Sequence, residues 1–314
     1  MAVIIVIYHY YLARLGWDSD FYFRGGYLCV DAFFVISGFL LAGMILSMPR
    51  NTSFLSWLKR RMRSIYPCYA VALFFAFAVK SYFGGLPDTH EIASLFEEVF
   101  MIHEWGIVQS NQYYNGATWY ISAMMFVSCA YFILVKRFTP QNRERIIASV
   151  SALCFSVMIM YFGNIHVHGI GKGFIPKGII RGFSGMGIGW QLFVFRDKIN
   201  LKYPGALFAL SVIMITVICL YAKDSYSDIL IYPATALALV SSQYIAVKSP
   251  AVQRAMIFSG RMSYALYLCH MTVQTIMFRL LHEYTLMMFI VASVAGAFVL
   301  MWGVSVIGHV LAWR

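Results

Sequence analysis

The chain has 314 residues, of which 61% are hydrophobic and only 12% are charged, and its mean hydropathy is +0.72. Soluble domains carry about 25% charged residues, so this composition excludes a soluble globular protein and indicates that lipid surrounds most of the chain. A net charge of +11 would suggest nucleic-acid binding in a soluble protein, but here it is typical of the basic loops that orient a membrane protein.

Long apolar segments recur from one end of the chain to the other. Because lipid offers the backbone no hydrogen-bond partners, we predict an all-α, polytopic transmembrane bundle that forms a single domain over 1–314, with no appended soluble domain. A spanning helix needs about 20 residues, and the first segment is short for this, so we expect its N-terminal part to be missing. The ten candidate spans are 1–15, 26–48, 65–83, 117–135, 146–163, 176–195, 205–222, 229–247, 262–279 and 286–311.

The connecting loops differ in charge. Basic residues gather in 49–64, 136–145, 196–202 and 248–261, whereas most acidic residues lie in the alternate loops. Since Lys and Arg are enriched in cytoplasmic loops, we predict that these four loops and both termini are cytoplasmic.

The longest loop on the predicted outer face is 84–116. Its first part, SLFEEVFMIHEWGIV, is predicted to form an amphipathic helix at the interface. After it, Tyr113, Tyr114 and Trp119 follow amide side chains, a combination that suits carbohydrate binding but also the aromatic belt of a membrane protein. The sequence leaves both interpretations open.

Asp31 is an acidic residue inside the apolar run 26–48. An ionisable group in a span is costly and marks a functional site with a partner. By helix rise, Asp31 lies roughly 8 Å below the outer surface, and His9 on the preceding antiparallel helix lies roughly 9 Å below it. We therefore predict a hydrogen-bonded His9–Asp31 pair in which the carboxylate makes His9 a general base; the alternative is a structural pair.

Motifs in order along the chain resemble the acyltransferase-3 family of integral membrane acyltransferases. GYLCVDAFFVISGFLL, which contains Asp31 and Ser37, resembles the family signature GxxGVDxFFxxSGF, with Cys29 in place of a glycine. IIVIYHYYL resembles the first family helix and places His9 at the position of the essential histidine. Further resemblances are LKRRMRSIYPCY, GATWYISAMMF, IIRGFSGMGIGWQLF and SGRMSYALYLCHMTV.

The resemblance implies an enzyme of the bacterial inner membrane. Such enzymes move an acyl group, usually acetyl from acetyl-CoA, to a hydroxyl of a cell-surface glycan or a related lipid-linked acceptor. His9 and Asp31 would be catalytic. Arg60, Arg61 and Arg63 would bind the CoA phosphates, although membrane topology also requires a basic loop at this place.

The donor is cytoplasmic, whereas His9 lies nearer the outer face. We therefore expect a polar channel through the bundle, with Ser37, Arg181 and His270 among its lining or substrate-binding residues. For Arg181 and His270 a paired structural role is equally compatible with the sequence.

Besides Cys29, the chain departs from the family pattern at three places: the arginine upstream of the family histidine is not included, WYISAMM lacks the acidic pair of many members, and Ser64 stands where the family often has a second arginine. The second departure indicates a branch close to exopolysaccharide-modifying enzymes. Alternative functions are a transporter or flippase of polysaccharide or lipid-linked sugar, and an inactive homologue that acts as an assembly partner.

Two weaker motifs suggest other sites. GMGIG at 185–189 lies inside a span, so we interpret it as close helix packing and not as a nucleotide loop. The histidines of HVHG, His166 and His168, are interpreted as part of a solvated loop, and we expect no metal.

Overall fold

The computed structural model describes residues 1–17, 19–85, 87–107, 113–162, 176–223, 226–281 and 283–310. In this part of the chain the regular structure is helical, which confirms the predicted all-α class. The α-helices are α1 Ala2–Leu15, α2 Leu28–Leu46, α3 Phe54–Gly84, α4 Thr89–Val99, α5 Trp119–Arg137, α6 Pro140–Phe162, α7 Lys177–Phe195, α8 Pro204–Tyr221, α9 Ile231–Ser242, α10 Pro250–Leu281 and α11 Leu286–Val310. Short 3-10 helices are η1 Arg24–Tyr27, η2 Gly116–Thr118, η3 Arg196–Lys198 and η4 Tyr226–Leu230.

Each of the ten predicted spans overlaps one α-helix, but α3 and α10 begin well before the predicted spans, so most of the basic segments 49–64 and 248–261 is helical and not loop. The helices also differ in their ability to cross a membrane. α1 is apolar but shorter than a span, and the 12 residues of α9 extend only about 18 Å against a hydrocarbon core of about 30 Å. The span count and the side of the termini therefore stay predictions. Six segments are long and apolar enough: Arg24–Leu46, Phe54–Gly84, Gly116–Arg137, Pro140–Tyr161, Pro204–Tyr221 and Leu286–Val306.

The remaining helix, α4, lies in the loop for which the sequence predicts an amphipathic helix. It begins several residues earlier than the quoted motif because a capping box fixes its start. The Asp88 side chain accepts a hydrogen bond from the Glu91 backbone at 2.8 Å, and the Glu91 side chain accepts one from the Asp88 backbone at 3.3 Å.

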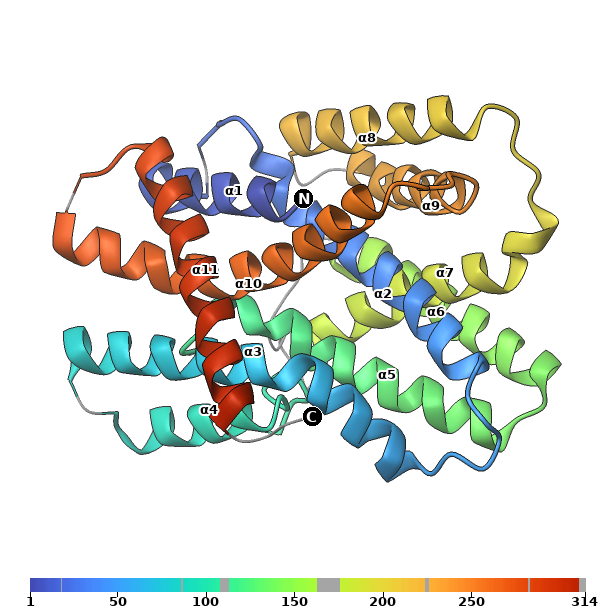
Figure 1. Ribbon diagram of the computed structural model, residues 1–314, viewed down its shortest axis with the longest axis horizontal. Coiled ribbons are helices and arrows are strands. Elements are labelled where there is room, and N and C mark those ends of the chain that lie inside the picture. The colour runs from blue at the N-terminus through green and yellow to red at the C-terminus, as the bar shows by residue number, and fades with distance from the viewer. Residues whose placement is uncertain are drawn as a thin grey trace.

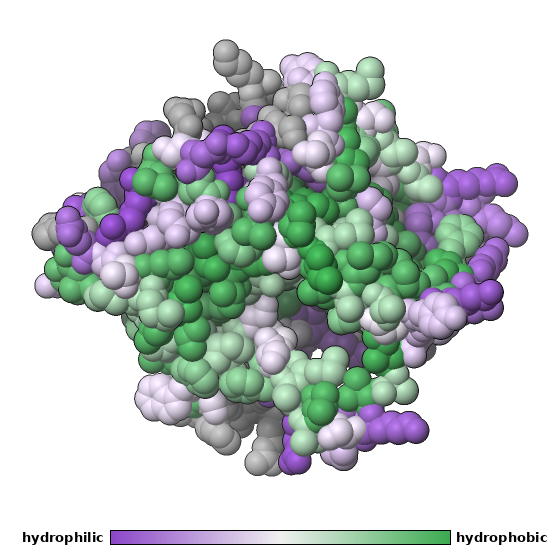
Figure 2. Space-filling model, turned by 90° about the horizontal axis from the view of Figure 1, so that it is seen from above, coloured by the Kyte–Doolittle hydropathy of each residue, from purple (hydrophilic) through white to green (hydrophobic). Residues whose placement is uncertain are grey.

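Most helices run along the long axis of the molecule. The connections after α3 and α10 lie at its left end, and those after α2 and α7 lie at its right end (Figure 1). Seen from above, hydrophobic residues cover most of the middle of the molecule, and strongly hydrophilic residues lie at the right end, on the left side and at places along the upper and lower edges (Figure 2). An apolar middle is expected for a protein that crosses a lipid layer.

Glycines bring α2 and α7 into close contact. A Cβ atom at Gly38 of α2 would lie 2.0 Å from a carbonyl oxygen of α7, and one at Gly189 of α7 would lie 1.9 Å from a carbonyl oxygen of α2. Only glycine permits two backbones to approach this closely, which confirms the interpretation of GMGIG as a packing motif. The contact places Asp31 of α2 beside Arg181 of α7.

Candidate functional site

A buried ion pair lies at the start of α2. The Asp31 carboxylate accepts two hydrogen bonds from Arg181, Nε to Oδ1 at 2.8 Å and Nη2 to Oδ2 at 2.6 Å, and a third from the Tyr232 hydroxyl to Oδ1 at 3.0 Å. Arg181 also donates to the Tyr27 carbonyl at 3.0 Å, and its guanidinium lies 5.2 Å from the Trp119 ring. Both charged side chains are almost completely buried, so each neutralises a charge that the interior could not otherwise hold.

Two histidines from opposite ends of the sequence form a second cluster. His9 Nδ1 of α1 and His270 Nε2 of α10 are 3.2 Å apart. His9 Nδ1 also lies 2.9 Å from the Ile5 carbonyl oxygen, and His270 Nδ1 lies 2.7 Å from the Tyr267 carbonyl oxygen. Gln274 donates from its side-chain amide to the His9 carbonyl at 2.7 Å, which fixes α1 against α10.

The hydrogen-bond network assigns the proton of each imidazole. A carbonyl oxygen only accepts, so a ring nitrogen that faces one carries a proton. His270 Nδ1 is therefore protonated, and its Nε2 is an acceptor when the ring is neutral. His9 Nδ1 faces this acceptor and the Ile5 carbonyl and carries its own proton, so the lone pair of neutral His9 lies on Nε2. His9 Nε2 is the basic atom of the cluster.

The predicted His9–Asp31 hydrogen bond is wrong. Among the described residues, Arg181 and Tyr232 bond the Asp31 carboxylate, whereas the His9 ring pairs with His270. Helix rise gives the depth of a residue but not the direction in which its side chain points around the helix axis. Here Asp31 points toward α7 and α9, and His9 points toward α10.

The two clusters remain neighbours through aromatic rings. The Tyr8 ring meets the His9 ring edge-on at a centroid distance of 5.0 Å, and it lies 6.0 Å from the ring of Tyr27. The Tyr27 carbonyl in turn accepts the hydrogen bond from Arg181. A chain of packed rings therefore connects the ion pair with His9.

Ser37 lies deeper in α2 and belongs to a group of hydroxyls. Its hydroxyl is 2.7 Å from that of Tyr120 on α5. The Tyr120 ring meets the Tyr267 ring edge-on at 5.9 Å, and the Tyr267 hydroxyl donates to the Ala117 carbonyl at 2.6 Å. These hydroxyls lie between α2, α5 and the part of α10 that carries His270.

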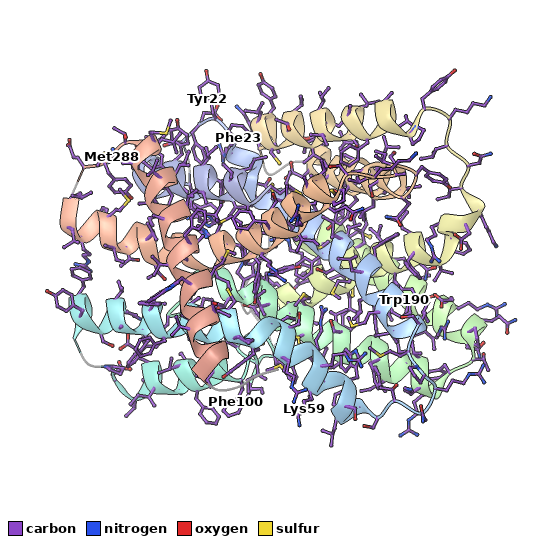
Figure 3. The ribbon with its side chains drawn as sticks, viewed as in Figure 1. Tyr22, Phe23, Lys59, Phe100, Trp190 and Met288 are labelled. Atoms are coloured by element: carbon purple, nitrogen blue, oxygen red, sulfur yellow. The ribbon has the colours of Figure 1, made fainter. Side chains whose placement is uncertain are left out.

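The three arginines at the start of α3 differ in placement. Arg61 is half-buried, and its guanidinium contacts the Met124 sulfur of α5 at 3.5 Å. Arg60 and Arg63 are exposed. The neighbouring Lys59 points away from the bundle (Figure 3). Of the three, Arg61 is the one that reaches between the helices.

Sequence reasoning missed a buried carboxylate in α4. Glu98 accepts hydrogen bonds from the backbone amides of Tyr114 and Asn115, the latter at 3.2 Å, and from the Thr118 hydroxyl at 3.2 Å. Burial raises the pKa of Glu98 to about 7. The Asn115 side chain donates to the Leu268 carbonyl at 2.8 Å, so Glu98 holds this loop against the turn of α10 that carries His270. The paired acids of SLFEEVF were the only signal, and it was ambiguous because two adjacent acids also fit on the polar face of an amphipathic helix.

A second buried carboxylate, Glu104, lies beside the predicted carbohydrate-binding aromatics. Tyr113 donates to its Oε1 at 2.8 Å, and burial raises the pKa of Glu104 to about 7. Tyr114 and Trp119 are buried as well. Tyr114 packs on Phe77 at a centroid distance of 5.4 Å, so its ring faces protein and not the membrane surface, as a belt residue would. By contrast, Tyr22 and Phe100 are exposed and point outward (Figure 3).

Among the described residues no three His, Cys, Asp or Glu side chains are grouped as metal ligands would be. His166 and His168 lie outside the described residues.

The fold and the site define an integral membrane helical protein with a histidine pair and a buried ion pair close to each other. A family model described as an acyltransferase domain matches residues 1–307. The chain therefore belongs to the acyltransferase-3 family, as its motifs predict. No curated protein and no solved structure matches it.

Proposed function

We propose that this protein is a membrane O-acyltransferase that moves an acyl group, expected to be acetyl, from acyl-CoA to a hydroxyl of a cell-surface glycan or a related acceptor in the bacterial inner membrane. Membership of the acyltransferase-3 family supports acyl transfer. The observation that carries the mechanism is the His9–His270 pair, which leaves the lone pair of His9 on Nε2. An alcohol is a weak nucleophile until a base of this kind removes its proton.

In the proposed step the acceptor hydroxyl gives its proton to His9 Nε2 while its oxygen attacks the thioester carbonyl carbon. The new C–O bond forms as the carbonyl electrons move to oxygen. The C–S bond then breaks, and the CoA sulfur leaves with the proton returned by His9. While His9 is protonated, the lone pair of His270 Nε2 and the Ile5 carbonyl stabilise its cationic ring through Nδ1–H.

His270 takes the role that the sequence predicts for Asp31, as the side chain that bonds the His9 ring. It is completely buried and donates from Nδ1 to the Tyr267 carbonyl. Two adjacent imidazoles cannot both be charged at low cost, so only one of the two rings is cationic at a time. In the proposed step His9 is the cationic ring and His270 stays neutral. Asp31 contributes through its bonds to Arg181 and Tyr232, which position α2, α7 and α9.

Arg61 is the proposed ligand for a CoA phosphate, because of the three arginines at the start of α3 it is the one that reaches toward α5, which carries Tyr120. Arg60 and Arg63 are exposed near the same place and are proposed to attract the polyanionic donor before it binds. For the acceptor, Tyr113 and the Glu104 carboxylate offer hydrogen bonds of the kind that sugars use.

The test is transfer of labelled acetyl from acetyl-CoA in membranes that contain the protein. His9→Ala is expected to reduce transfer at least about 100-fold, the usual contribution of a general base. His90→Ala is the matched control, because His90 is exposed on α4. Unchanged acetylation in His9→Ala would refute the mechanism, and substrate movement without consumption of the thioester would indicate a transporter.

A further inference from the structure

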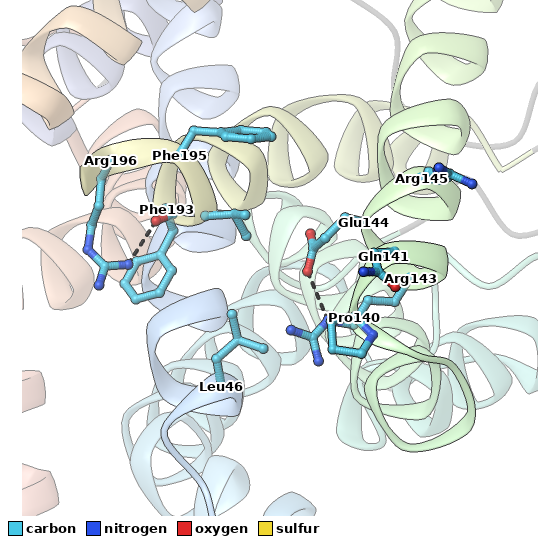
Figure 4. Close-up of a pocket in the computed structure, with 10 residues that line it drawn as sticks. Leu46, Pro140, Gln141, Arg143, Glu144, Arg145, Phe193, Phe195 and Arg196 are labelled. Atoms are coloured by element: carbon cyan, nitrogen blue, oxygen red, sulfur yellow. Dashed lines mark hydrogen bonds and ion pairs between the residues drawn. The ribbon is translucent and has the colours of Figure 1, made fainter. Parts of the chain in front are cut away.

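Two hollows lie next to each other along α6 and α7 and share Phe195 in their linings. The first, about 540 Å³, lies where α2 ends, α6 begins and α7 ends (Figure 4). The second, about 520 Å³, continues along α6 and α7 as far as α9. Together they form one groove, which we call the α6–α7 groove.

The two hollows lie along the same face of α6 and α7, because several of their lining residues recur every three or four positions on each helix. At this spacing the side chains of a helix lie on one face. The residues are Arg145, Ala148, Ala152 and Phe155 on α6, and Phe195, Leu192 and Ile188 on α7. From Arg145 to Phe155 the helix rises about 15 Å, which is half the thickness of a hydrocarbon core.

One end of the groove is cationic. Arg196 stands on one side of the first hollow, and Arg143 and Arg145 stand on the other (Figure 4). The Glu144 carboxylate between them is occupied by hydrogen bonds from Arg143 Nε at 2.8 Å and from the indole nitrogen of Trp190 at 2.7 Å.

The exposed carboxylate of Asp197 lies 3.4 Å from Arg196. Three guanidinium groups against these two carboxylates leave an excess of positive charge. This end lies on the face that the basic loops predict to be cytoplasmic.

The other end of the groove reaches the buried ion pair. Tyr232 lines the second hollow, and its ring packs against Phe155 at a centroid distance of 5.4 Å. The Tyr232 hydroxyl donates to Asp31. A molecule that fills the groove would therefore touch the side chain that completes the Asp31–Arg181 cluster.

We propose that the α6–α7 groove binds one anionic phospholipid of the surrounding membrane. The headgroup phosphate lies among Arg143, Arg145 and Arg196, and one acyl chain follows the apolar face of α6 and α7 to Tyr232. The cationic end fits a phosphate, and the length of the apolar part fits the depth of one lipid leaflet. The bound lipid supports the ion pair from the side of Tyr232 and makes its geometry sensitive to membrane composition.

The headgroup is tested with the full chain in nanodiscs of phosphatidylglycerol, followed by extraction into detergent and native mass spectrometry of the retained lipid. The triple variant Arg143→Gln, Arg145→Gln, Arg196→Gln is expected to lose retained phosphatidylglycerol at least about tenfold relative to the wild type. A control triple variant, Lys59→Gln, Arg254→Gln, Arg261→Gln, removes the same charge from exposed positions outside the groove and is expected to retain it.

The acyl chain is tested with Ala152→Trp, which fills the groove and leaves every charge in place. Ala209→Trp on α8, also exposed, is its matched control. Of these two tryptophan variants, Ala152→Trp is expected to lower lipid retention and Ala209→Trp is expected to leave it unchanged.

Retention at the wild-type level in the arginine triple variant or in Ala152→Trp would overturn the proposal, and so would displacement of phosphatidylglycerol by free CoA. None of these measurements requires acyl transfer, so the lipid site and the proposed enzymatic function can fail independently.

Discussion

The Asp31–Arg181 pair allows a quantitative prediction for Asp31→Asn. The substitution keeps the shape of the side chain but removes its charge from a completely buried site. Oδ1 accepts two hydrogen bonds and Oδ2 accepts one, so an amide placed either way turns its NH₂ toward a donor of Arg181 or Tyr232. The guanidinium then lacks a counter-charge in the interior. Breaking one side of a buried pair in this way costs about 3–5 kcal/mol.

The loss is measured as the thermal unfolding temperature of the purified protein in detergent, at one fixed scan rate. With about 2 °C per kcal/mol for a chain of this size, the expected decrease is about 6–10 °C. The double variant Asp31→Asn, Arg181→Met removes both charges and fills the space with an apolar chain of similar length. It is expected to recover most of the loss.

Two outcomes of comparing the single and double variants would be informative. If Asp31→Asn unfolds at the wild-type temperature, or if the two substitutions add without coupling, the ion pair does not support the fold and our reasoning is refuted. If the double variant regains stability but not acyl transfer, the charged pair has a role in the reaction that is separate from its structural one.

Three further predictions concern pH, packing and the donor. Burial raises the pKa of Glu104 from 4.5 to about 7, so the stability that its proton contributes is complete below pH 4.5 and is lost as the pH rises through 7. Glu104→Gln should reduce this pH dependence in thermal scans, and the part that remains is expected from Glu98, whose pKa is raised in the same direction. Gly189→Ala forces a methyl group to within 1.9 Å of the Val35 carbonyl and should cost about 1–3 kcal/mol or more, measured as a lower unfolding temperature. Arg61→Ala should raise the KM for acetyl-CoA about 10–100-fold, because it removes a charged hydrogen-bond donor, whereas the exposed Arg60→Ala should change it little.

Each of these predictions has a control or an opposing outcome. Glu283→Gln replaces an exposed acid and should leave the pH dependence unchanged. A Cβ atom at Gly205 would meet no atom within 4 Å, so Gly205→Ala should be neutral or slightly stabilising. A stable Gly189→Ala variant would contradict the close approach of α2 and α7. Equal effects of Arg60→Ala and Arg61→Ala on KM would show that the start of α3 acts by its charge alone.

The sequence by itself determined that lipid surrounds this protein, that its class is helical, and roughly where each long helix lies, although not where α3 and α10 begin. Hydropathy is a local property, because a run of apolar residues must be helical wherever lipid surrounds it. The sequence also identified polar residues that could not face lipid, among them His9, Asp31, Arg181 and His270. All four have hydrogen-bond partners inside the bundle.

Only the tertiary structure decided which of these residues meet. Depth along a helix follows from counting residues, but the direction of a side chain depends on how each helix rotates against neighbours that are distant in sequence. Asp31 therefore pairs with Arg181, 150 positions away, and His9 with His270, 261 positions away. The same limit hid Glu98, whose burial depends on the fold of α4 and the loop that follows it onto α10.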